Sequence, residues 1–154
     1  MIDNLGLKGQ LELIRVTPNG DLERTFVPNT IVSVGKSMVA GLMVADVNVG
    51  SRFDWIAIGV GSNTIAAGNN TLGSEYMKYG LGSIIGSTTT TSVTNDTAQW
   101  IGSFGIISSK TINEAGIFNK SGLNTGSMLA RTTFTGISCA SGDTLRATWK
   151  VQVS

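Results

Sequence analysis

The sequence contains no histidine and a single cysteine, Cys139, among its 154 residues. Histidine is the usual general base near neutral pH and a common metal ligand. Its absence excludes Ser-His-Asp triads, Cys-His pairs and histidine-ligated metal centres. One cysteine cannot form an internal disulfide or a thiolate cluster, so we expect Cys139 to pack as a small hydrophobic residue.

Charged residues are also scarce, at 14% of the chain, with a formal net charge of +1. The 11 Lys and Arg residues are scattered singly, and no basic patch of the kind that binds nucleic acid is visible. Apolar residues make up 41% of the chain, which is not the composition of a disordered protein. A surface so poor in charge favours a protein that is covered by neighbours in an assembly.

Long apolar runs are missing as well. The longest, around Met38 to Val47, is interrupted by Gly41 and Asp46 and is shorter than the about 18 residues of a membrane-spanning helix. The N-terminus shows no basic region followed by an apolar core, so no secretion signal is visible. We therefore expect no membrane partner, and a protein that is made in the cytoplasm.

What the sequence does contain is a regular alternation of apolar and polar residues, clearest at 144–153. The apolar positions of this segment are Leu145, Ala147, Trp149, Val151 and Val153. A period of two over this length predicts a half-buried β-strand. Further strands are expected at 7–16, 22–27, 53–60, 75–81, 84–94, 99–107, 112–119 and 127–137.

The turn signal at 17–21 joins the first two strands into an N-terminal hairpin, which we expect Pro28 to end because proline cannot donate to a ladder. One amphipathic helix is expected at 34–45, with Ser33 as its cap. Gly35 and Gly41 weaken this helix by about 1 kcal/mol each, so packing must hold it in place.

These elements predict a mainly β, antiparallel fold with one short helix. About eight or nine strands at regular spacing are typical of a sandwich, a jelly-roll-like domain or a barrel-like domain. We expect a single domain over 1–154, with the hairpin at 1–28, the helix at 34–45 and the main sheet at 53–154.

Catalytic chemistry would depend on the carboxylates. Asp21, Asp96 and Asp143 lie in turn contexts, where Asp usually accepts hydrogen bonds from nearby backbone amides. Asp54 and Glu114 lie in apolar segments and are harder to assign. A glycosidase needs two carboxylates that face each other, and no second partner is apparent for either residue. We therefore expect no enzymatic activity.

Glu114 must either face solvent or find a partner, because an unpaired buried carboxylate is costly. Arg131 lies on the next expected strand. One interpretation is a structural Glu114–Arg131 pair that is bidentate and partly buried. The other is that both side chains are exposed.

No cofactor or metal motif is found. Gly59–Asn63 is glycine-rich after a strand, but it lacks the third glycine and the following helix of a nucleotide-binding loop. Asp-x-Asn calcium loops are also missing. Trp55, Trp100 and Trp149 could stack on sugars, but their alternation with aliphatic residues favours core packing.

Three C-terminal motifs carry a family resemblance. In the order Glu114–Asn119, Gly126–Phe134 and Gly142–Trp149, they resemble a group of small virion structural proteins of tailed bacteriophages. Asn29–Val32 and Ile56–Gly61 match the same pattern upstream. The chain departs from it after Glu75, where the relatives tend to continue with a basic residue.

The resemblance implies a non-enzymatic protein of the virion. Many such proteins resemble capsid decoration (cement) proteins, which sit on the head as homo-oligomers, often trimers, and clamp the major capsid protein. Others belong to tails or fibres, so a tail, fibre-associated or receptor-binding component is an alternative. A carbohydrate-binding module with an exposed tryptophan and a hydrolase using Asp54 or Glu114 are alternatives from other classes.

Overall fold

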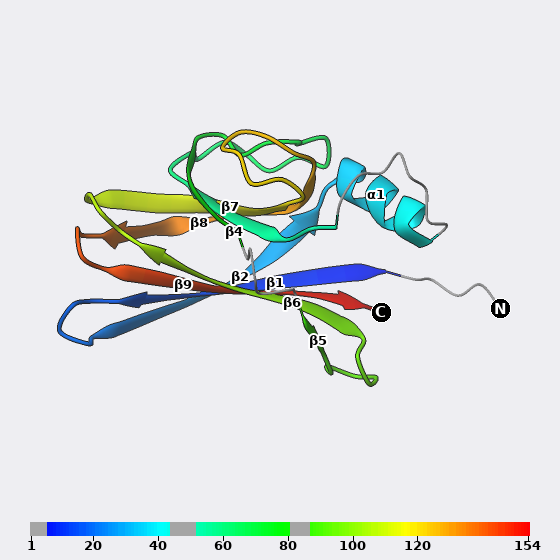
Figure 1. Ribbon diagram of the computed structural model, residues 1–154, viewed down its shortest axis with the longest axis horizontal. Coiled ribbons are helices and arrows are strands. Elements are labelled where there is room, and N and C mark those ends of the chain that lie inside the picture. Colours follow the sequence, from blue (N-terminus) through cyan, green and yellow to red (C-terminus); the bar gives the residue numbers. More distant parts are fainter. Residues whose placement is uncertain (1–5, 44–51, 81–86) are drawn as a thin grey trace.

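A computed structural model describes residues 6–43, 52–80 and 87–154 of the chain. These residues form one curled, nine-stranded antiparallel sheet, a half-barrel, with the strand order β4-β3-β7-β8-β2-β1-β9-β6-β5 and one short helix (Figure 1). The expected mainly β, antiparallel fold with one short helix is confirmed.

The elements are bounded as follows: β1 Leu7–Val16, β2 Leu22–Ile31, α1 Ser33–Met43, β3 Trp55–Gly59, β4 Glu75–Gly80, β5 Ser87–Thr89, β6 Thr97–Gly105, β7 Lys110–Phe118, β8 Met128–Cys139 and β9 Thr144–Val153. The expected strands at 7–16 and 144–153 have the bounds of β1 and β9. On β9 the alternation also holds, because Leu145, Ala147, Trp149 and Val151 are buried, whereas Val153 at the end is 44% exposed.

The curled sheet has two halves that face each other. We call β2, β1, β9, β6 and β5 the β9 half, and β4, β3, β7 and β8 the β7 half; they form the lower and upper layers of Figure 1. The main core lies between them and includes Leu11 and Trp149 from the β9 half and Ile56 and Ile117 from the β7 half, each 0% exposed.

Strand β2 joins the two halves, and here the expected end of the hairpin at Pro28 is wrong. Pro28 lies within β2 opposite Gln10, and the strand continues until Thr30 and Ile31 pair with β8. The carbonyl of Pro28 accepts a hydrogen bond from Thr132 Oγ1 of β8 at 2.6 Å. In an extended strand the N–H and C=O of one residue point to the same side. The N–H that Pro28 lacks would therefore face β8, and the ladder between β2 and β8 begins only at Thr30, so no ladder hydrogen bond is lost.

Helix α1 ends at Met43; the expected residues 44 and 45 lie outside the described part of the chain. Val32 stands at the N-cap in place of the expected Ser33, because its carbonyl accepts the bond from Lys36 N at 3.1 Å. The helix packs against β8, and a Cβ at the buried Gly35 would collide with the carbonyl oxygen of Leu129. The glycine that lowers helix propensity is therefore what allows this close packing.

The expected strand at 84–94 is largely wrong. Residues 84–86 lie outside the described part, and the strand that follows, β5, ends at Thr89. The carboxylate of Asp96 accepts hydrogen bonds from the three successive amides of residues 91–93, at 2.9 to 3.0 Å. These bonds give the backbone an alternative to a sheet ladder, so a threonine-rich segment with strong strand propensity forms turns.

Candidate functional site

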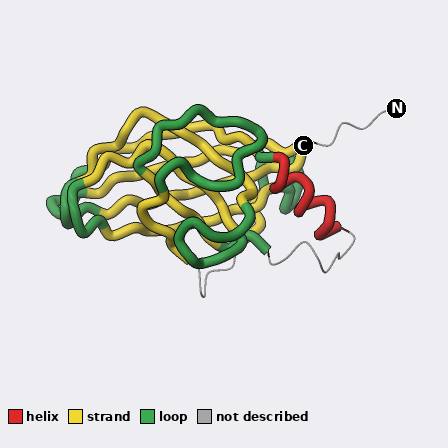
Figure 2. Tube along the Cα trace, turned by 90° about the horizontal axis from the view of Figure 1, so that it is seen from above, coloured by secondary structure: helices red, strands yellow, loops and turns green. Residues whose placement is uncertain are grey.

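The outer face of the β7 half is covered by two loops, residues 60–74 and 119–127 (Figures 1 and 2). A small second core lies on this side of the molecule and contains Val32, Ala57, Leu72, Phe118 and Met128. The β7 half is therefore buried on both faces. The charged residues singled out by the sequence lie beneath the first of these loops.

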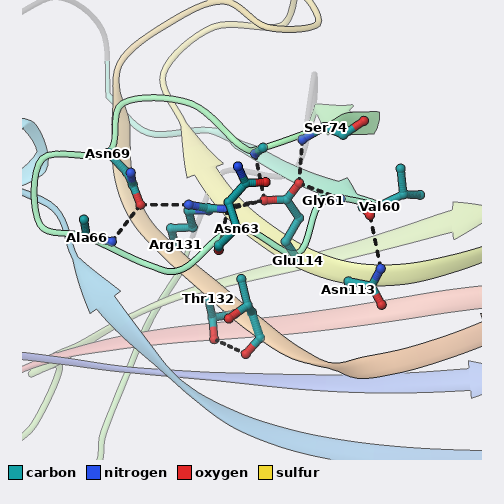
Figure 3. A network of polar contacts seen from close by, with 12 residues as sticks. Val60, Gly61, Asn63, Ala66, Asn69, Ser74, Asn113, Glu114, Arg131 and Thr132 are labelled. Carbon is teal, nitrogen blue, oxygen red and sulfur yellow. Dashed lines mark hydrogen bonds and ion pairs between the residues drawn. The ribbon is translucent and has the colours of Figure 1, made fainter.

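Glu114 projects from β7 toward loop 60–74, where the loop backbone surrounds its carboxylate (Figure 3). Its Oε1 accepts hydrogen bonds from the amides of Gly61 at 3.0 Å and Ser74 at 2.8 Å. Its Oε2 accepts a third from the amide of Gly73 at 2.9 Å. Glu114 is 0% exposed, so this carboxylate ties both ends of the loop to the sheet from inside.

Arg131 projects from β8 into the same space. Its Nε and Nη2 donate to Glu114 Oε2 at 3.2 and 2.8 Å. Nη1 donates to Asn69 Oδ1 at 2.8 Å, and Nη2 also donates to the carbonyl of Asn63 at 3.3 Å. The guanidinium is thus shared between a strand neighbour and the middle of the loop (Figure 3).

The structure brings Glu114 and Arg131 together, and the interpretation in which both are exposed is wrong, since Arg131 is 1% exposed. Two details differ from the expected bidentate, partly buried pair. Nε and Nη2 of Arg131 contact the same carboxylate oxygen, and the pair is fully buried. The reason is that the other oxygen, Oε1, accepts hydrogen bonds from the loop amides of Gly61 and Ser74. The sequence alone does not predict that these amides lie there.

The pKa of Glu114 reflects two opposing effects. Burial raises it, but the amides of Gly73 and Ser74 and the guanidinium of Arg131 outweigh the burial, so the pKa lies below the ordinary value. Glu114 is therefore ionised at neutral pH, with both oxygens engaged. A general acid needs a proton and access to substrate, and Glu114 has neither.

The glycine-rich stretch after β3 has a structural explanation in the same site. A Cβ at Gly59 or Gly61 would lie too close to Glu114 Oε1. A Gly-x-Gly sequence that resembles an anion-binding loop therefore does surround an anion, which is the protein's own carboxylate. No nucleotide is required to explain these two glycines.

The other carboxylates singled out by the sequence have different partners. Asp143, 2% exposed, accepts bonds from Arg15 Nε at 2.6 Å and from the amide of Ala140 at 2.8 Å. That amide and then the guanidinium lower the pKa of Asp143.

Asp54 pairs with Arg52 at 2.7 Å on the surface. Asp21 accepts from the hydroxyl of Thr17 at 3.2 Å, whereas Asp96 and Asp143 bond nearby amides as expected.

Sequence reasoning missed a second buried pair, Glu75 and Lys78 on β4, whose side chains are 0% and 1% exposed. Residues three apart in a regular strand point to opposite faces, but a bulge at Tyr76 puts both on one side. Lys78 Nζ lies 3.3 Å from Glu75 Oε1 and donates to the carbonyls of Gly122 and Thr125 at 2.8 and 3.1 Å. The pair therefore fastens the second loop, as Glu114 and Arg131 fasten the first.

Two of the three tryptophans are core residues, as expected. Trp149 is 0% and Trp100 7% exposed, and the indole N–H of Trp100 donates to the carbonyl of Phe53 at 2.6 Å. Trp55 is half-buried and packs against the small second core. Trp100 and Trp149 consequently offer no exposed ring for a sugar to stack on.

Within residues 6–43, 52–80 and 87–154, no group of three or more acidic or Cys side chains is arranged to hold a metal ion. In that same part of the chain, no helix is long and apolar enough to cross a membrane. Comparison with known proteins finds no matching family model, no similar curated protein and no similar solved structure.

Proposed function

We propose that this protein is a structural component of a bacteriophage virion, and specifically a capsid decoration protein. It binds the outside of the head as a homo-oligomer and stabilises the lattice of the major capsid protein. The starting point is the resemblance of the three C-terminal motifs, which form β7, β8 and β9 in this fold.

The observation that carries the proposal concerns the charged residues of those motifs. Three of the four, Glu114, Arg131 and Asp143, are at most 2% exposed and engaged in contacts within the molecule. They hold loops and strands together and are closed to any substrate. Such contacts support a rigid scaffold and give the hydrolase alternative no accessible acid at Glu114.

A decoration protein acts by mass action. If each copy binds the expanded, assembled shell but not free or unexpanded subunits, binding adds RT ln(1 + [L]/Kd) to the stability of the shell. At a free concentration 100 times Kd this is about 2.7 kcal/mol per site. A protein with 14% charged residues suits this passive role.

The direct test is to add purified protein to expanded heads that lack it and to count bound copies against the major capsid band on a gel. We expect saturation at a fixed ratio to the lattice and heads that withstand higher temperature. A few copies per particle, or binding to isolated tails with none on heads, would contradict the proposal and favour the tail or fibre alternative.

A further inference from the structure

The two halves of the sheet differ in what covers them. The loops 60–74 and 119–127 lie over the β7 half, and α1 packs against β8 (Figure 1). Among the described residues, most of the outer face of β2, β1, β9 and β6, which we call the open face, is covered by no helix or loop. At its edge the loop after β5 reaches this face, where Gln152 Nε2 donates to Ser92 Oγ at 2.7 Å and to Asp96 Oδ2 at 3.0 Å.

Strand register defines the residues of the open face, because paired residues share a side. Three successive rows run across the strands and consist of Gln99, Lys150, Gln10 and Pro28, then Ile101, Thr148, Glu12 and Phe26, then Ser103, Arg146, Ile14 and Arg24. Lys8 lies beside these rows on β1, opposite Gln152.

Cations that are far apart in the sequence lie on this same face. Lys8, Arg24, Arg146 and Lys150 are all exposed, and Glu12 is the acid on this face of the strands. The carboxylate of Asp96 reaches the edge of the face, where it accepts a hydrogen bond from Gln152 at 3.0 Å. Glu12 lies 3.2 Å from the Nε of Arg24. Within the described part of the chain, the other three cations have no acidic partner. The pairing of β1 with β9 therefore creates a positively charged surface that the linear sequence does not show.

Apolar side chains lie between the charges. Phe26 is 55% and Ile101 41% exposed, in the row that also holds Thr148. Exposed aromatic and aliphatic groups with polar and charged neighbours are typical of protein interfaces. A nucleic-acid binder that makes about 6–10 phosphate contacts neutralises more charge than the three unpaired cations of this face supply.

We propose that the open face is a docking surface for an acidic surface of another protein. This inference rests on the proposed function, in which that surface is the outside of the assembled shell. Charge complementarity argues for the acidic partner. The same face of a second copy is a poor partner, because a twofold contact would bring like charges together. Arg146, the exposed fourth charged residue of the C-terminal motifs, lies near the start of β9 within this face.

The decisive variant is Arg146→Glu with Lys150→Glu. Its matched control is Lys36→Glu with Lys120→Glu, which makes the same change in net charge at two exposed positions on α1 and in loop 119–127. We expect the first variant to bind heads about tenfold more weakly, since two attractive contacts become repulsive, and the control to bind within about twofold of wild type. Thermal unfolding of both should match wild type.

The outcomes separate the two proposals. If wild type binds heads and both variants bind equally well, the open-face inference is wrong and the proposed function stands. If wild type does not bind heads, the proposed function fails, and the face is tested without heads by NMR. Amide shifts are then recorded on adding poly-L-glutamate and, separately, a single-stranded oligonucleotide of equal charge.

We expect poly-L-glutamate to shift amides of β1, β9 and β6 around Lys150 and Thr148, and the Arg146→Glu, Lys150→Glu variant to lose these shifts. Shifts confined to other strands, or none at millimolar peptide, would overturn the inference. Tighter binding of the oligonucleotide than of the peptide would also overturn it and assign the face to nucleic acid.

Discussion

Gly61 donates its backbone N–H to Glu114 Oε1 at 3.0 Å, and a Cβ at Gly61 would collide with that same oxygen. One residue thus supplies a hydrogen bond and the space that the carboxylate needs. The loop and the strand residue require each other, and this mutual dependence is open to test.

Replacing Glu114 with Gln should destabilise the protein by about 3 kcal/mol, because Arg131 stays buried without its counterion. For a domain of this size that lowers Tm by roughly 6–12 °C. Thermal and urea unfolding measure the effect. Glu12→Gln is the control: its partner Arg24 is exposed, so the loss should stay below about 1 kcal/mol. An unchanged Tm in Glu114→Gln would mean that the pair has no structural role.

Replacing Gly61 with Ala should cost about 1–3 kcal/mol, because the added methyl displaces the carboxylate of Glu114. Gly68→Ala in the same loop is the matched control, since a Cβ there meets nothing within 4 Å. Urea midpoints for the two variants should differ clearly. Equal midpoints would show that the loop adjusts to the methyl group without loss.

Acid should weaken the protein through Glu114. Its pKa is lower in the folded protein than in the unfolded chain, so its contribution is complete above the unfolded value of about 4.3 and is lost as pH falls through the folded value. Asp143 acts in the same direction. Urea midpoints measured from pH 7 to pH 3 should fall, and the gap between wild type and Glu114→Gln should narrow. A constant gap would contradict this assignment.

The Glu75–Lys78 pair should behave as a buried unit. Burial lowers the pKa of Lys78, although Glu75 raises it. Lys78→Met leaves the fully buried Glu75 carboxylate alone and should cost roughly 3 kcal/mol. Glu75→Leu combined with Lys78→Met should recover most of this loss, since two apolar side chains then fill the site. A double variant that loses the sum of both single effects would show that the two residues act independently.

Cys139 should react slowly in the folded protein. It is 3% exposed, and burial raises the pKa of its thiol, while the nearby Arg15 lowers it less. Ellman's reagent should label it on unfolding in urea, along the same curve as tryptophan fluorescence. Fast labelling without denaturant would contradict the packing seen here.

The fold class and the strand bounds of β1 and β9 could be predicted, because alternation over ten residues depends on local chemistry alone. The continuation of β2 past Pro28 could not be predicted, because it depends on where the neighbouring strand β8 begins to pair with β2. The turns after β5 could not be predicted either. The carboxylate of Asp96 binds the amides of residues 91–93, and these hydrogen bonds outweigh the strand propensity of the threonines there.

The candidate site was predicted in part. A glutamate in an apolar strand must face solvent or find a partner, and the sequence offered Arg131 on the following strand as that partner without deciding between the two. The loop amides and Asn69 escaped prediction because they lie at least 40 residues away in sequence from the charge they bind. The same limit hid Lys78, whose side depends on the bulge at Tyr76.

By itself, then, the amino-acid sequence determined that the chain is mainly β, lacks histidine chemistry and carries an acid in an apolar strand that must be either paired or exposed. Tertiary structure decided that loop 60–74 encloses this acid, that most of the outer face of the β9 half is left open and that Lys8, Arg146 and Lys150 lie on that face. The reason is physical: side-chain period is a local property, whereas burial and charge clustering depend on which distant strands become neighbours.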